Sequence, residues 1–88
     1  MKTFDLTDSK GNSVMTIMAD TIHNATYRAL NNLEHTVTPY IDNDDDTVMD
    51  YHLIDTNSKE EVSVFKTFFY ENALTEALSI LGYSVYEL

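Results

Sequence analysis

The segments N-A-T-Y-R-A-L-N-N-L (residues 24–33) and N-A-L-T-E-A-L-S-I-L (residues 72–81) decide the fold. They align without a gap after a shift of 48 positions, and each places alanine and leucine along one side of a helix. Asp20 or Thr21 can cap the first helix, and Gly82 is well placed to end the second. The sequence therefore predicts two amphipathic helices of similar construction.

Segments in which apolar and polar residues alternate lie on both sides of each helix. Such alternation is typical of strands that bury one face. Pro39 has no amide proton to donate, so its strand is expected at a sheet edge or at a bulge. The predicted strands are residues 2–7, 13–19, 36–41, 47–55, 61–67 and 83–88.

The order of these elements divides the chain into two strand–strand–helix–strand halves. The same shift pairs Val14 with Val62 and Leu6 with Ile54, which suggests an internal duplication. The alternative is that two amphipathic helices converge on alanine and leucine independently. Either way, residues 1–88 are expected to form a single small α+β domain. Its predicted architecture is one antiparallel sheet of five to six strands, in the order ββαβ-ββαβ, with both helices on one face.

Negative charge is the most unusual property of the composition. Fifteen acidic residues against five basic ones give a net charge of −10, and residues 42–61 alone carry eight acids with Lys59 as their one base. Repulsion argues against direct binding to DNA, RNA or an anionic membrane and favours a basic or nucleic-acid-handling protein as partner. The acids expected to form the partner-binding surface are Asp42, Asp44, Asp45, Asp46, Asp50, Asp55, Glu60 and Glu61.

The aspartates could instead form a calcium site. Asp42, Asp44 and Asp46 have the one-three-five spacing of an EF-hand loop. Thr47 stands where that loop needs glycine, and Leu53 stands where it needs a glutamate. We therefore expect no specific metal site. Loose cation association and a solvated loop that only maintains solubility remain open interpretations.

No set of residues indicates catalysis. His23 and His35 are too far apart to form an i, i+4 ligand pair, and a neighbouring Asp50 and His52 on one strand are more often structural. The sequence contains no nucleophile-elbow motif and no glycine-rich phosphate loop. The protein is expected to be no enzyme and to need no cofactor.

Aromatic residues suggest self-association. They lie at the junction before the second helix and in the C-terminal segment. Their number is larger than a small core can bury, so some are expected to be exposed. Phe65 and one of Phe68 and Phe69 are expected in the core. A homodimer built on the last strand and the second helix is the interpretation that follows. The residues expected to mediate it are Phe68, Phe69, Tyr70, Tyr83 and Tyr86.

The chain has no cysteine and no apolar run of signal-peptide length near its N-terminus. A cytoplasmic location is the expectation. With its D-N-D-D-D segment (residues 42–46), its size and its acidity, the chain resembles the small acidic accessory proteins of bacteriophages, some of which inhibit host defence and imitate DNA.

That resemblance implies a non-enzymatic inhibitor, acting in the host cytoplasm, that blocks a nucleic-acid-handling or defence protein through its negative surface. The alternative function is a structural or assembly module that self-associates through aromatic residues while its acids maintain solubility. A cation-responsive protein is a third hypothesis.

Overall fold

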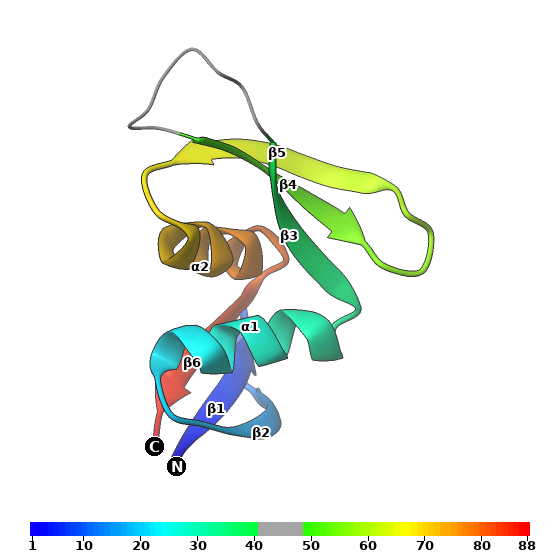
Figure 1. Cartoon of the computed structure of the whole chain (residues 1–88). Helices are drawn as coiled ribbons and strands as arrows, with labels where there is room; N and C mark the ends of the chain where they lie inside the picture. The colour runs from blue at the N-terminus through cyan, green and yellow to red at the C-terminus, as the bar shows by residue number, and fades with distance from the viewer. Residues whose placement is uncertain (41–48) are drawn as a thin grey trace.

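The computed structural model describes residues 1–40 and 49–88, which contain two helices and six strands (Figure 1). The α+β class is as predicted, and β2 and β5 have the predicted bounds. The elements are β1 (Lys2–Asp8), β2 (Ser13–Ala19), α1 (Ile22–Asn32), β3 (His35–Tyr40), β4 (Met49–Asp55), β5 (Glu61–Thr67), α2 (Tyr70–Ile80) and β6 (Tyr83–Glu87).

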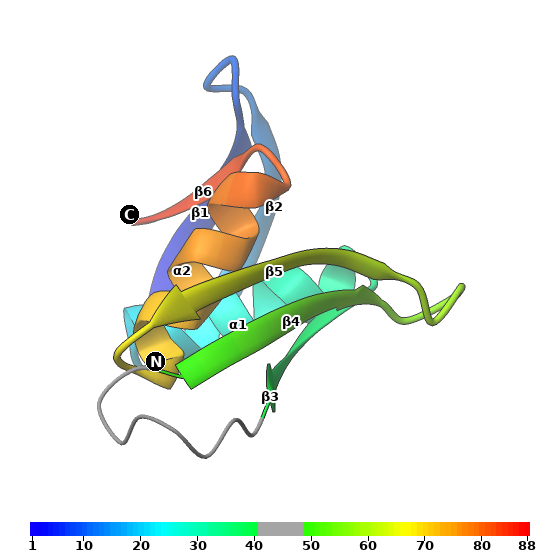
Figure 2. The ribbon, with the colours of Figure 1, turned by 90° about the horizontal axis from the view of Figure 1, so that it is seen from above.

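The strands form two antiparallel sheets of three, in the orders β2-β1-β6 and β3-β4-β5. The prediction of one sheet of five to six strands with both helices on one face is therefore wrong. The reason is an exchange: β3 leaves its own half to pair with β4, and β6 leaves its half to pair with β1. Figures 1 and 2 show both helices lying between the two sheets.

The two helices bury equivalent residues. Their alanines and leucines belong to one buried core, and the two helices contact each other. Each helix contacts strands of both sheets, so the helical pair joins them. The buried helical residues are Ala25, Thr26, Ala29 and Leu30 in α1 and Ala73, Leu74, Ala77 and Leu78 in α2. Neither helix of the described part of the chain is long and apolar enough to cross a membrane.

The two sheets also have the same register. Leu6 of β1 pairs with Val85 of β6, and Leu53 of β4 pairs with Val37 of β3. A β-bulge follows each leucine. The predicted match of Leu6 with Ile54 is therefore one residue out. The turn after β4 is one residue longer than the turn after β1. Equivalent residues of the two halves are therefore 47 positions apart before this turn and 48 positions apart after it.

Four positive φ angles fall at equivalent places in the two halves. Gly11 (83°) and Lys59 (64°) hold equivalent places in the turns between paired strands. Glu34 (63°) and Gly82 (86°) hold equivalent places after the helices. One half thus uses glycine where the other half forces a side chain into the left-handed region. The repeat is one of backbone conformation as well as of sequence.

Candidate functional site

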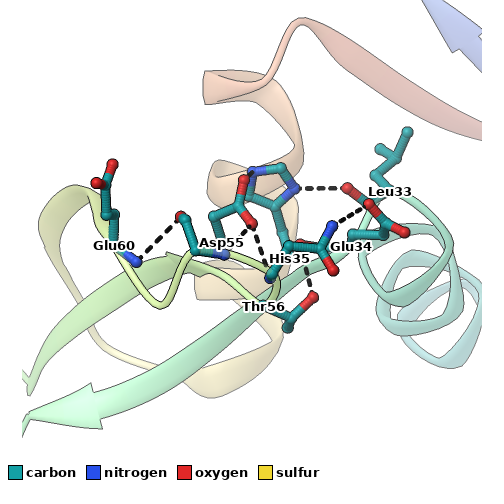
Figure 3. Close-up of polar contacts among 8 residues, drawn as sticks. Leu33, Glu34, His35, Asp55, Thr56 and Glu60 are labelled. Atoms are coloured by element: carbon teal, nitrogen blue, oxygen red, sulfur yellow. Dashed lines mark hydrogen bonds and ion pairs between the residues drawn. The ribbon is translucent and has the colours of Figure 1, made fainter.

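The turn between α1 and β3 contacts the turn that joins β4 to β5, as Figure 3 shows. Glu34 ends the turn between α1 and β3, and its carbonyl oxygen accepts hydrogen bonds from the backbone nitrogen and from Oγ1 of Thr56, each at 2.9 Å. The side-chain amide of Asn57 donates to the Glu34 carboxylate. These bonds join segments 22 residues apart in the sequence and hold Glu34 in its left-handed conformation.

Asp55 organises the turn between β4 and β5. Its Oδ1 accepts the backbone N–H groups of Asn57 at 2.9 Å and Ser58 at 3.2 Å. These bonds, from Ser58 first and Asn57 second, together with the nearby His35, hold the pKa of Asp55 below its ordinary value. Asp55 is therefore ionised at neutral pH, with its carboxylate fixed in place.

His35 connects the same two turns. Its Nδ1 lies 2.7 Å from the Leu33 carbonyl oxygen, and because a carbonyl only accepts, Nδ1 carries a proton. Its Nε2 lies 4.0 Å from Oδ2 of Asp55 (Figure 3). The ring is mostly covered, with 17% of its side chain exposed. This histidine connects the end of α1 to the β4–β5 turn, while the backbone N–H groups of Asn57 and Ser58 orient Asp55.

Four acidic residues belong to the two turns and the adjoining strand termini at this end of the hairpin, and we call them the hairpin-end acidic cluster. Glu60 follows the turn, and its carbonyl oxygen accepts the backbone N–H of Asp55 at 3.0 Å. Glu61 opens β5 with its Oε2 2.7 Å from Nδ1 of His52, and half of its side chain is exposed. The members of the cluster are Glu34, Asp55, Glu60 and Glu61.

The remaining acids predicted for the negative surface lie elsewhere or outside the described residues. Asp50 sits at the other end of β4, about 17 Å along the strand from Asp55, and faces Nζ of Lys66 at 3.8 Å. Asp42, Asp44, Asp45 and Asp46 fall within residues 41–48, which the structure does not describe. The structure thus brings three of the predicted acids together: Asp55, Glu60 and Glu61.

Glu34 was missed by the sequence prediction. It comes directly before β3 in a segment with little net charge, and only tertiary pairing brings it to Thr56. No local pattern signals such a contact. Its one sequence clue is its place opposite Gly82 in the internal alignment, which shows that a positive φ is needed there.

The predicted aromatic residues lie in two separate places. Phe68 and Phe69, 61% and 65% exposed, join β5 to α2, so the expectation that one of them is in the core is wrong. Tyr70 stands against the Tyr51 ring with centroids 6.2 Å apart, and burial raises the pKa of Tyr70. Tyr83 and Tyr86 belong to β6 in the other sheet.

These two tyrosines differ in exposure. Tyr83 is half-buried against the core, whereas Tyr86 is 58% exposed opposite Asp5. A shallow pocket lies between the N-terminal ends of the helices and includes Tyr27 and Tyr70. The exposed apolar residues of β6 and those of the β5–α2 junction therefore form two distinct surfaces.

The arrangement supplies negative charge at the end of the β4–β5 hairpin. Within residues 1–40 and 49–88, no group of three or more His, Asp and Glu side chains lies close enough together to hold a metal ion. Leu53, at the position of the missing EF-hand glutamate, is fully buried in the core. Comparison with protein-family models, with curated proteins and with solved structures gave no match for this chain.

Proposed function

We propose that this protein is a non-enzymatic binding module that recognises a basic protein through its negative surface. The observation that carries the proposal is the hairpin-end acidic cluster, which places four acidic residues at one end of the β4–β5 hairpin in a chain of net charge −10. The partner that fits is a nucleic-acid-handling or defence protein, and the protein would inhibit it as some small acidic phage proteins do.

The chemistry of the cluster supports recognition of arginine and lysine. The Asp55 carboxylate is held in place by backbone donors, so little conformational entropy is lost when a cation meets it. Glu60 and Glu61 are exposed beside it. Exposed charge of one sign accelerates encounter with an oppositely charged surface, and it makes the association rate fall as salt is added.

Imitation of DNA is the mechanism that fits such a partner. Carboxylates on a strand and its turns stand several ångströms apart, on the scale of successive phosphates. A groove lined with lysine and arginine would accept the cluster in place of a nucleic acid. The protein itself is then expected to bind neither DNA nor RNA.

Matched charge variants test the proposal. The tagged protein is used to capture proteins from a bacterial lysate, and bound proteins are eluted with a salt gradient and identified. The partner is then purified and titrated against the protein, against Glu60→Gln/Glu61→Gln and against Glu71→Gln/Glu76→Gln. The second variant removes the same charge from the exposed side of α2 and serves as the control.

The expected result is a basic partner whose affinity falls about tenfold with Glu60→Gln/Glu61→Gln and about twofold or less with the α2 control. A third variant, Asp44→Asn/Asp45→Asn/Asp46→Asn, measures the contribution of these three aspartates. If both glutamine variants weaken binding equally, general charge rather than this surface is responsible. If neither these nor the asparagine variant changes the affinity, the proposed mechanism is wrong.

A second function is favoured by the exposed Phe68 and Phe69. A structural or assembly module would use them for self-association, with the acids maintaining solubility. Sedimentation of the protein over a range of concentrations, compared with Phe68→Ser/Phe69→Ser, tests it. An assembly that dissociates in the serine variant, with no basic partner captured from lysate, would favour this second function over the first.

A further inference from the structure

We propose that the open edge of β5 pairs with β5 of a second copy of this chain, antiparallel and about a two-fold axis near Val64. The sheet β3-β4-β5 would then continue into the same sheet of the second copy. Among the described strands, β5 has a hydrogen-bonded neighbour on one side only, and Figure 2 shows it as the border of the sheet opposite β3. An open edge offers unpaired backbone N–H and C=O groups as a template for another strand.

The internal repeat shows why this edge differs from the equivalent edge of the other sheet, β2. Arg28 of α1 donates from Nη1 to the carbonyl oxygen of Met18 in β2, at 2.8 Å. A side chain of the protein thus already occupies part of that edge. The residue of α2 equivalent to Arg28 is Glu76, which has no proton to donate to a carbonyl at neutral pH. The matching backbone position in β5 is left without this protection.

The exposed face of β5 carries an apolar residue at position 64, where the equivalent position of β2 is polar. Val62 and Val64 are 47% and 48% exposed. Val64 occupies the position that Thr16 holds in β2, and both face away from the core. Because Thr16 shows that a polar residue is accepted there, the exposed valine is not needed for folding. It is suited to cross-strand contact with another apolar side chain.

Charge complementarity identifies a second copy as the occupant. β5 is preceded by Glu60 and begins with Glu61, and it carries Lys66 near its other end, with 73% of the lysine side chain exposed. Antiparallel pairing of two such strands brings Lys66 of each copy next to the acidic end of the other. The edge is therefore complementary to itself, as a two-fold interface requires. Pairing of the same two strands in parallel would place like charges together.

Phe68 and Phe69 continue from this strand and extend the apolar area. At the equivalent junction of the first half stand Asp20 and Thr21, and Thr21 caps α1 by accepting the Asn24 N–H at 3.2 Å. Phe69 holds the same capping position in α2 without any side-chain hydrogen bond. The second half thus replaces a polar, capping pair with two exposed phenylalanines at the end of the proposed interface.

Substitutions at position 64 test the pairing directly, because the two-fold axis places residue 64 opposite itself. Val64→Lys and Val64→Glu each put like charges face to face, whereas a mixture of the two variants puts opposite charges together. Thr16→Lys at the equivalent position of β2 is the matched control. Sedimentation velocity over a wide range of protein concentration measures the dissociation constant of the dimer.

We expect the wild-type protein to dimerise and each position-64 variant to raise the dissociation constant about tenfold or more. The mixture of Val64→Lys and Val64→Glu is expected to dimerise again, and Thr16→Lys to stay within about twofold of wild type. Circular dichroism establishes that each variant is folded. Hydrogen exchange on the unaltered protein gives an independent measurement: raising the concentration should slow exchange in β5 and leave β2 unchanged.

Several results would overturn the proposal. One is a protein that stays monomeric, with exchange in β5 independent of concentration. Another is a dimer that Thr16→Lys weakens as much as Val64→Lys. A third is a dimer that Tyr86→Ser abolishes while the position-64 variants leave it intact, since the interface would then lie on β6. All of these measurements are made without a basic partner, so they do not depend on the proposed function.

Discussion

Leu6 in β1 and Leu53 in β4 occupy the same place in the two sheets. Each is fully buried, each is followed by a β-bulge, and each pairs with a valine from the last strand of the other half. The two leucines lie 47 residues apart in the sequence and are part of one core. This equivalence makes the repeat a property of packing that can be measured.

Leu6→Ala and Leu53→Ala are expected to destabilise the protein by similar amounts, each by about 2–5 kcal/mol. Both remove the same buried methyl groups from equivalent surroundings. Urea-induced unfolding followed by circular dichroism gives the two free energies. Val14→Ala and Val62→Ala, at equivalent exposed positions, serve as controls and should each cost about 0.5 kcal/mol or less. A large difference between the two leucine variants would show that the halves are not energetically equivalent.

Phe69→Thr should stabilise the protein by about 0.5–1 kcal/mol, because threonine supplies the N-cap hydrogen bond that α1 receives from Thr21 and α2 lacks. Thermal unfolding measures the change. Thr21→Ala is the complementary variant and should cost about 1 kcal/mol. A destabilised Phe69→Thr variant would mean that the exposed phenylalanine contributes packing of its own.

Gly11 and Lys59 both adopt positive φ angles in the turns between paired strands, so substitutions at the two positions should change the free energy of unfolding in opposite directions. Lys59→Gly should stabilise the protein by about 1 kcal/mol, because glycine relieves the positive φ that the lysine adopts. Gly11→Ala should destabilise it by a similar amount. A Cβ at Gly11 would meet no atom within 4 Å, so the cost comes from the backbone alone. Chemical unfolding of both variants tests this, and equal signs for the two changes would contradict it.

The lowered pKa of Asp55 predicts how stability depends on pH. A carboxyl whose pKa is lower in the folded state stabilises the protein above its unfolded pKa of about 3.9, and the stabilisation disappears as the pH falls through the folded pKa. Asp55→Asn keeps a carbonyl acceptor but not the charge. Wild type should therefore melt above the variant at pH 5–7, with the difference disappearing as the pH falls through the lowered pKa of Asp55 in the folded protein.

Asp20→Asn is the control for this measurement, since Asp20 is an exposed aspartate outside the β4–β5 turn. Its melting temperature should follow that of wild type across the same range. A difference between wild type and Asp55→Asn that stays constant from neutral to strongly acidic pH would show that ionisation of Asp55 is not the cause.

The sequence contained the elements and their order but not their assembly into sheets. The alternation of apolar and polar residues predicted β5 as Glu61–Thr67, and the spacing of alanine and leucine predicted both helices. Val37 and Val85 are both valines at matching positions, so either strand could have completed either sheet. The choice depends on contacts far apart in the chain, which no local pattern records.

The same limit applies to the candidate site. Asp55, Glu60 and Glu61 are close in sequence on either side of a predicted turn, and their gathering follows from a hairpin. Glu34 joins them only because β3 pairs with β4 and brings the preceding turn to Thr56. The exposure of both Phe68 and Phe69 was not predicted, because one of the two was expected in the core, to which hydrophobic residues at a junction normally contribute.

The exchange of β3 and β6 has a consequence for how the molecule comes apart. Each half donates its last strand to the other, so neither half retains a complete three-stranded sheet if the other unfolds. Partial opening of one sheet removes the edge strand that the opposite half depends on. The two halves are thus interlocked, and the repeat, although it looks like two modules, is expected to fold and unfold as a single cooperative unit.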